Sequence, residues 1–122
     1  MKRTILIVDD SESVREMLTY SLEDAGYDIL AGVDGEDALK FFDDNHKINL
    51  VITDLHMPRL DGIGFIKKVR VLDNYRYVPI LFLTTESQGS KKEEAKNAGA
   101  TGWLVKPFVA EKLLTVIKKV LR

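Results

Sequence analysis

Five polar residues stand behind short apolar runs, and their side chains together could hold a metal ion and a phosphate group. They are Asp9, Asp10, Asp54, Thr84 and Lys106. Each alone has a plain structural explanation, such as capping a helix. If the apolar runs are parallel strands, however, the carboxyl ends of neighbouring strands meet at one edge of the sheet, where ligands bind. The sequence therefore predicts three carboxylates, a hydroxyl and an ammonium around one crevice.

Electrostatic repulsion decides what such a crevice needs. Each pair of carboxylates at 4 Å repels by about 1 kcal/mol in water and by several times more at the dielectric of a protein. A bound cation relieves that repulsion, and donors that are all hard oxygens, with no nitrogen or sulfur among them, favour Mg²⁺. Lys106 supplies a second positive charge.

Phosphoryl transfer to a carboxylate is the chemistry that uses these groups together. Asp54 would attack phosphorus and become an aspartyl phosphate. Mg²⁺ and Lys106 would stabilise the equatorial oxygens of the transition state. The Thr84 hydroxyl would donate a hydrogen bond to a phosphoryl oxygen of the product.

Short runs rich in isoleucine, leucine and valine predict the strands that position these groups. The runs span residues 5–8, 50–52, 80–83 and 103–105, and a weaker run spans 29–31. Continuous apolar runs of this length are typical of strands covered on both faces of a parallel sheet.

Stretches with helical periodicity separate the runs. Ser13 with Glu16 and Ser90 with Glu93 have the spacing of capping boxes, and Asp34 is a further candidate N-cap. The helix that starts at Ser90 offers few apolar anchors, so we expect it to be loosely held and able to move. We expect helices at about residues 13–25, 34–42, 63–72, 90–98 and 109–120.

Alternating strands and helices predict an α/β fold with three layers, in which helices cover both faces of a five-stranded parallel sheet. The run 29–31 is the most polar and suits an edge strand, whereas 5–8, 50–52 and 80–83 suit the centre. These preferences agree with the flavodoxin-like, doubly wound strand order 2-1-3-4-5.

Composition limits the other possibilities. A chain of 122 residues, 45% hydrophobic and 30% charged, is typical of one globular domain. The net charge of −1 gives no electrostatic basis for binding nucleic acid or an anionic membrane. The absence of cysteine excludes disulfides and thiolate chemistry, and two histidines cannot form a three-histidine metal centre. The first apolar run is too short for a signal peptide or a membrane span, so we expect a cytoplasmic protein.

At these residues the sequence resembles the receiver domain of bacterial two-component response regulators. The resemblance covers the whole chain, and its pieces are specific because they occur in order at strand ends. With no room for an output domain, residues 1–122 resemble the single-domain, chemotaxis-type (CheY-like) members. The matching motifs are Asp9-Asp10, Asp54-Leu55-His56-Met57-Pro58, Asp61-Gly62, Thr84 and Lys106-Pro107-Phe108.

The resemblance implies a role for each residue of the crevice. Asp54 resembles the phosphoacceptor. Asp10, Asp54 and the backbone carbonyl of His56 would coordinate Mg²⁺, and Asp9 would act through bound water. Lys106 would pair with the phosphoryl group.

The resemblance also implies a switch. Thr84 would move toward the phosphoryl group, and the aromatic side chain of the last strand, Trp103, would then change rotamer. That change would alter the face formed by the last strand and the last two helices, where a target protein binds. The Lys106–Pro107 peptide bond is expected to be cis, an isomer that only proline makes readily accessible.

Some positions depart from the family pattern. Trp103 stands where the family usually has tyrosine or phenylalanine, and an indole is larger and can only donate a hydrogen bond. The alternative is that Trp103 simply packs on the helix 90–98. Thr85 is β-branched where small residues are usual and could narrow access to the site. His56 and Glu86 flank the site and could tune the phosphoryl lifetime.

The leading hypothesis is a phosphorylation-controlled binding switch of the phosphorelay or chemotaxis type. It is not an enzyme, beyond assisting its own phosphorylation and dephosphorylation. Its partners would be a sensor histidine kinase or histidine phosphotransfer domain and a downstream target protein, with no nucleic acid and no membrane, and we expect a monomer.

Two other hypotheses are open. A phosphohydrolase of the haloacid-dehalogenase type needs a second aspartate two residues after the nucleophile, where this chain has His56, and an inserted cap segment. A flavin or nucleotide binder of the same topology would carry a glycine-rich phosphate motif, and neither G-x-G-x-x-G nor the P-loop pattern occurs.

Overall fold

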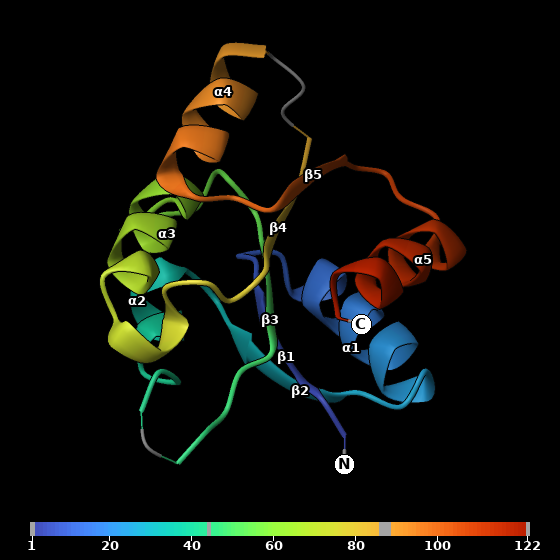
Figure 1. The fold of residues 1–122 in the computed structure, drawn as a ribbon. Helices are drawn as coiled ribbons and strands as arrows, with labels where there is room; N and C mark the ends of the chain where they lie inside the picture. Colours follow the sequence, from blue (N-terminus) through green and yellow to red (C-terminus); the bar gives the residue numbers. More distant parts are fainter. Residues whose placement is uncertain (1, 44, 86–88, 122) are drawn as a thin grey trace.

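The computed structural model describes residues 2–43, 45–85 and 89–121 of the 122-residue chain. Strands and helices alternate along it in the predicted order (Figure 1). The strands are β1 (Thr4–Val8), β2 (Asp28–Gly32), β3 (Leu50–Thr53), β4 (Ile80–Thr84) and β5 (Gly102–Val105). The helices are α1 (Glu12–Asp24), α2 (Gly35–Leu39), α3 (Gly62–Arg70), the short 3₁₀ helix η1 (Asp73–Tyr75), α4 (Gly89–Ala98) and α5 (Ala110–Val120).

The sheet has the strand order β2-β1-β3-β4-β5, and every neighbouring pair is parallel. This confirms the predicted doubly wound topology, with the polar β2 at one edge. The register sets Val8 of β1 beside Thr53 of β3, and Thr84 of β4 beside Val105 of β5. The carboxyl ends of these four strands therefore meet at one edge of the sheet, as the site requires.

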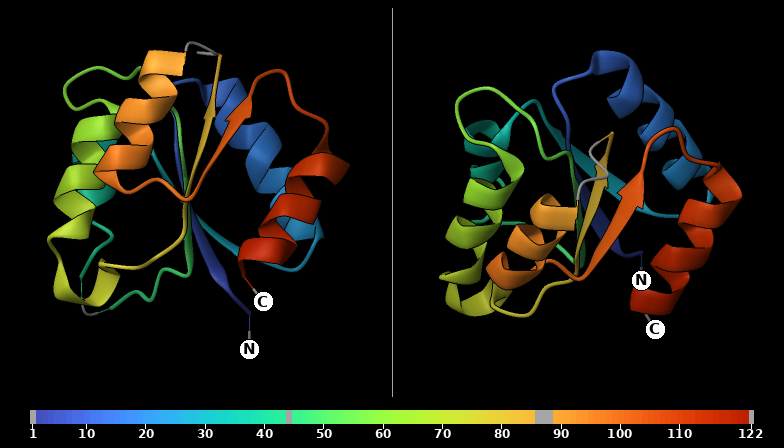
Figure 2. Two further views of the ribbon diagram at one scale, coloured as in Figure 1. Left: turned by 45° about the horizontal axis from the view of Figure 1, so that its top comes forward. Right: turned by 90° about the horizontal axis from the view of Figure 1, so that it is seen from above.

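Helices cover both faces of the sheet. Figures 1 and 2 show α1 and α5 on one face and α2, α3 and α4 on the other. The side chains of β1 explain why two cores form, because successive residues of a strand point to opposite faces. Ile5 and Ile7 belong to the core under α1 and α5, whereas Leu6 and Val8 belong to the core on the other face. All four are fully buried, so the strands that carry the site are rigidly held.

Two of the three predicted N-caps are wrong. The hydroxyl of Ser11, not that of Ser13, accepts a hydrogen bond from the backbone N–H of Val14, and α1 begins one residue after Ser11. Ser90 lies inside α4, which begins at Gly89. The third prediction is confirmed, because the Asp34 carboxylate caps α2.

Helix α4 is weakly anchored, as the sequence indicates. Ala95 is its buried residue, and the rest of the helix is exposed or half-buried. Its carboxyl end is held by Arg70 of α3, whose Nη2 donates to the carbonyl oxygen of Gly99 at 2.7 Å. Gly99 has a φ of +113°, which favours glycine at the end of a helix. Among the described residues, α4 is therefore held by a narrow apolar contact centred on Ala95 and by the Arg70 bond at its carboxyl end, rather than by a broad apolar face.

Candidate functional site

Three carboxylates converge where β1 and β3 end. Asp9 and Asp10 follow β1, and Asp54 follows β3. One carboxylate oxygen from each residue lies within 4.8 Å of the others. Asp9 is buried, Asp54 is half-buried and Asp10 is exposed, so the cluster opens to solvent on the side of Asp10. The structure thus brings the three predicted metal-binding aspartates together.

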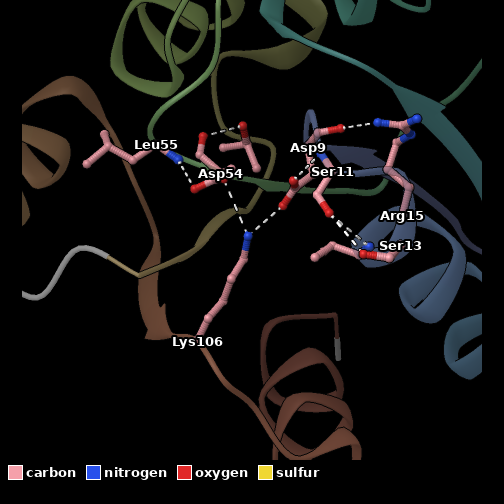
Figure 3. A network of polar contacts seen from close by, with 9 residues as sticks. Asp9, Ser11, Ser13, Arg15, Asp54, Leu55 and Lys106 are labelled. Carbon is pink, nitrogen blue, oxygen red and sulfur yellow. Dashed lines mark hydrogen bonds and ion pairs between the residues drawn. The ribbon is translucent and has the colours of Figure 1, made fainter.

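The ammonium of Lys106 reaches this cluster from β5, past the end of β4 (Figure 3). Its Nζ lies 2.8 Å from Oδ2 of Asp9 and 3.4 Å from Oδ2 of Asp54. The backbone N–H of Lys106 donates to the carbonyl oxygen of Thr84 at 2.8 Å. This bond continues the pairing of β4 and β5 and fixes the position of the Lys106 backbone. The Lys106–Pro107 peptide bond is cis, as predicted.

The cluster keeps Lys106 charged. Burial alone would lower its pKa, but the hydrogen bond to Asp9 and the negative charges of Asp54 and Asp9 outweigh burial and raise the pKa above its ordinary value. The ammonium is therefore a permanent positive charge at neutral pH, and it offsets one of the three carboxylate charges.

Backbone N–H groups orient two of the carboxylates. The N–H of Leu55 donates to Oδ1 of Asp54 at 2.7 Å, which leaves Oδ2 of Asp54 facing Lys106. The N–H of Ser11 donates to Oδ1 of Asp9 at 2.9 Å. These contacts hold each carboxylate with one oxygen turned to the backbone and the other to the lysine (Figure 3).

The donor set fits Mg²⁺. Carboxylate oxygens are the protein ligands this ion prefers, usually one or two of them, with water and substrate phosphate oxygens completing its shell. The three carboxylates still carry unbalanced negative charge after Lys106 is counted, so a divalent cation would relieve repulsion that the fold otherwise has to tolerate. His56 is exposed in the loop after Asp54, and its predicted role as a carbonyl ligand stays a prediction.

The two predicted switch residues lie on the neighbouring strands. Thr84 is fully buried at the end of β4. The half-buried Trp103 of β5 packs against Phe82, with ring centroids 5.3 Å apart. Trp103 also lines a cavity of about 270 Å³ whose other walls include Ala95 and Lys96 of α4. Its indole is therefore placed between the core of the sheet and α4. This packing is compatible both with a switch role for Trp103 and with simple packing on α4.

Of the flanking residues, Thr85 is exposed beyond the end of β4. Glu86 lies outside the described residues.

Sequence reasoning missed two arginines, Arg15 and Arg59. Nη1 of Arg15 donates to the backbone carbonyl of Asp9 at 2.7 Å, and Arg59 pairs with the buried Asp34. Arg15 lies one helical turn from the Ser11 N-cap, which is a signal that could have found it. Nothing in the spacing of Arg59 and Asp34 predicts their contact, since 25 positions and two elements, α2 and β3, separate them.

Comparison with known proteins decides the family. A family model described as the response regulator receiver domain matches residues 5–118. The chain belongs to the response regulator receiver domain family. The family works in two-component signalling, so the phosphohydrolase and nucleotide-binder hypotheses have no support. Receiver domains bind Mg²⁺ through an acidic pocket, receive their signal from a histidine kinase and act on a downstream target.

Relatives of this receiver domain include both long and short proteins. It is 40% identical to the probable transcriptional regulator ycf27 of Porphyridium aerugineum over 99% of this chain and 49% of that protein. The chain therefore spans about half the length of that relative. It is 34% identical to the chemotaxis protein CheY1 of Helicobacter pylori strain J99, over 96% of this chain and 95% of that one.

Comparison with solved structures supports the same family. The chemotaxis protein CheY4 of Vibrio cholerae, crystallised at low pH, matches with a TM-score of 0.94 and 44% identity, covering 99% of this receiver domain and 100% of that chain. The identity and the coverage together support a CheY-like receiver and not merely a shared fold.

Proposed function

We propose that residues 1–122 form one receiver domain that acts as a phosphorylation-controlled binding switch, with Asp54 as the phosphoacceptor. One observation carries the proposal: three carboxylate oxygens lie within 4.8 Å of one another, and the Lys106 ammonium contacts two of the three residues. A half-buried carboxylate placed beside a metal-binding cluster and a fixed positive charge is suited to attack phosphorus.

The proposed transfer moves a phosphoryl group from a histidine of the donor protein to Asp54. A carboxylate oxygen of Asp54 forms the bond to phosphorus while the phosphorus–nitrogen bond of the donor histidine breaks, and the leaving imidazole keeps that electron pair. Asp10, Asp54 and the carbonyl of His56 would hold Mg²⁺, and Asp9 would act through its water. The ion would neutralise charge on the phosphoryl oxygens, and Lys106 would do the same from the side of β5.

The output of the switch is the face formed by α4, β5 and α5. Thr84 and Trp103 would transmit the change, since Thr84 ends β4, the strand beside β3, and Trp103 of β5 lines the cavity next to the weakly anchored α4. Val105 and Val109 are 40% and 64% exposed on this face, which suits binding of a target protein.

The proposal also covers the partners, the activity, the oligomeric state and the location of the domain. The partners are a sensor histidine kinase or a histidine phosphotransfer domain and a target protein. The domain does not turn over a substrate, it is a monomer, and it acts in the cytoplasm. Among the described residues, no helix has both the length and the apolar character to cross a membrane.

Incubation with Mg²⁺ and a small acyl phosphate tests the function directly. We expect each chain to gain one phosphoryl group, because Asp54 can attack such a donor without a kinase. Intact-protein mass spectrometry measures the gain, and EDTA should block it. Equal incorporation with and without EDTA would contradict the metal dependence.

The coupling to the output face has its own optical readout. Trp103 is the only tryptophan in the sequence. We expect phosphorylation to move its emission to shorter wavelength, because the proposed change of rotamer turns the half-buried indole inward and buries it more deeply. The matched control is Asp54→Asn, whose emission should not respond to the acyl phosphate. Full phosphorylation with unchanged emission would show that Trp103 merely packs beside α4.

A further inference from the structure

We propose that Arg59 is a positioning residue, which ties the loop between β3 and α3 to the first turn of α2 and thereby fixes the backbone around His56. The inference rests on the proposed function, because that loop carries the predicted carbonyl ligand of the metal ion. It assigns a role to a residue that lies outside the acidic cluster.

The backbone at Arg59 is held in a strained turn. The N–H of Leu60 donates to the carbonyl oxygen of Pro58 at 2.7 Å, which closes a γ-turn around Arg59. The φ of Arg59 is +67°, and among the described residues it is the sole non-glycine with a positive φ. A γ-turn of this hand is rare, and such strain persists only where surrounding contacts enforce it.

The enforcing contact is an ion pair with a buried carboxylate. Nη2 of Arg59 bonds Oδ2 of Asp34, which is 1% exposed, and Nε of Arg59 lies 3.7 Å from the exposed carboxylate of Glu36. The other oxygen of Asp34 caps α2 by accepting from the N–H of Asp37 at 2.8 Å. A buried carboxylate that loses its cation is strongly disfavoured, so the pair resists release of the turn.

Close packing adds a second restraint on the same turn. A β-carbon on Gly35, the first residue of α2, would come within 2.8 Å of the carbonyl oxygen of Leu60. The base of the loop is closed separately, where the N–H of Gly62 donates to the carbonyl oxygen of Leu55 at 2.8 Å. His56 lies between the closed base and the anchored turn, so both ends of its segment are fixed.

The anchor is also close in sequence to the strand that pairs with the backbone of Asp9, on the other side of the acidic cluster. Asp34 lies two residues beyond Gly32, whose carbonyl oxygen accepts from the N–H of Asp9 at 3.2 Å. Arg59 therefore joins the loop that carries His56 to the segment that borders Asp9. Removal of the pair would free these two sides of the site to move apart.

The sign of the change in Mg²⁺ affinity tests the inference. On charge alone, removing Arg59 makes the surroundings more negative and would tighten cation binding. Loss of positioning should instead weaken it, by about tenfold, as for other residues that orient metal ligands. Arg59→Gly is the informative variant, because glycine accepts a positive φ without strain and the chain should still fold.

Calorimetric titration with Mg²⁺ and amide hydrogen exchange of residues 55–61 without metal are the two readouts. We expect weaker binding and faster exchange for Arg59→Gly. Asp34→Asn keeps the α2 cap but removes the charge, so it should reproduce the effect, and the double variant should add little to either single change. Arg76→Gly is the matched control, since Arg76 is similarly exposed and its one ion pair within the described part of the chain is with the exposed Asp73.

Phosphorylation rates distinguish a failure of the role proposed for Arg59 from a failure of the proposed function. For Arg59→Gly, the rate should fall at low Mg²⁺ and recover at saturating Mg²⁺, because positioning acts through the ion. Unchanged or tighter Mg²⁺ binding by this variant would overturn the role of Arg59 while leaving the proposed function standing. No Mg²⁺ binding or no phosphoryl gain by the unmodified chain would overturn the proposed function itself.

Discussion

Asp54→Asn should abolish phosphoryl incorporation from an acyl phosphate and leave the fold intact. The asparagine amide is nearly the same size, and its oxygen can still accept the N–H bond that Leu55 makes at 2.7 Å to Asp54. The amide is not a nucleophile at phosphorus, so the bond that forms the aspartyl phosphate cannot be made. Intact mass after incubation with Mg²⁺ should show one added group on the unmodified chain and none on the variant.

Asp61→Asn is the matched control for this change. Asp61 is an exposed aspartate in the same loop, and it caps α3 by accepting from the N–H of Gly64 at 2.8 Å. Asparagine caps a helix as well as aspartate does, so this variant should fold and be phosphorylated normally. A phosphoryl group found on Asp54→Asn, for example on Asp9 or Asp10, would show that the acceptor is a different carboxylate of the cluster.

The strand ends were predictable because one physical rule governs all of them. A continuous apolar run marks a strand buried on both faces, and parallel strands bring their carboxyl ends to one edge of the sheet. The residues after these runs therefore had to lie near one another, and the structure places Asp9, Asp54 and Lys106 in contact.

Local capping was less predictable because two serines compete for it. The spacing of Ser13 and Glu16 matches a capping box, but Ser11 is the cap. The N–H of Ser11 is bound to the carboxylate of Asp9 at 2.9 Å, so the geometry of the acidic cluster sets where α1 starts. A tertiary contact thus overrides a good local motif.

Contacts between distant loops lie beyond periodicity altogether. The pairing of Arg59 with Asp34 depends on how α2 packs against the loop before α3. The anchoring of α4 by Arg70 at Gly99 depends in the same way on the packing of α3 against α4. Hydrophobic patterns indicate which face of a helix is buried, but they do not indicate which surface arginine contacts a carbonyl or carboxylate of a neighbouring element.

The carboxylate that Lys106 contacts most closely is a further feature that the sequence did not predict, and it has a large energetic consequence. The family resemblance directs this lysine toward the phosphoryl group on Asp54, but in the structure its Nζ lies nearer to Asp9, at 2.8 Å against 3.4 Å. Asp9 is only 3% exposed, and the Lys106 ammonium is the positive charge that contacts its carboxylate. Without a metal ion, the lysine is the nearest compensation for a buried carboxylate.

Lys106→Met should therefore destabilise the metal-free protein by about 3 kcal/mol, the scale of breaking a buried ion pair. Methionine keeps much of the aliphatic volume and removes the charge, which isolates the electrostatic loss. Urea unfolding measures the change in the free energy of unfolding. Mg²⁺ should reduce the difference in the free energy of unfolding between the variant and the unmodified chain, because the ion then neutralises Asp9, Asp10 and Asp54. Phosphorylation should slow by about a hundredfold, the usual effect of losing one stabilising donor at the transition state.

The pH dependence of this loss has a definite sign. The pKa of Lys106 is raised in the folded protein, because its bonds to the two aspartates outweigh burial. A group with a raised pKa contributes its full stability below its unfolded pKa and loses it as the pH rises through the folded pKa. The difference between the unmodified chain and Lys106→Met should therefore stay constant from neutral pH to about pH 10 and shrink above it.

Lys67→Met on the exposed face of α3 is the control, and it should change neither stability nor its response to Mg²⁺. The decisive comparison is the size of the Lys106→Met effect with and without the ion. If Mg²⁺ reduces the destabilisation caused by Lys106→Met, the lysine and the metal ion neutralise the same carboxylates. The buried Asp9 then has a cation beside it whether or not the metal ion is bound. If the effect is equal in both conditions, Mg²⁺ does not substitute for the ammonium, and the lysine and the ion do not neutralise the same carboxylates.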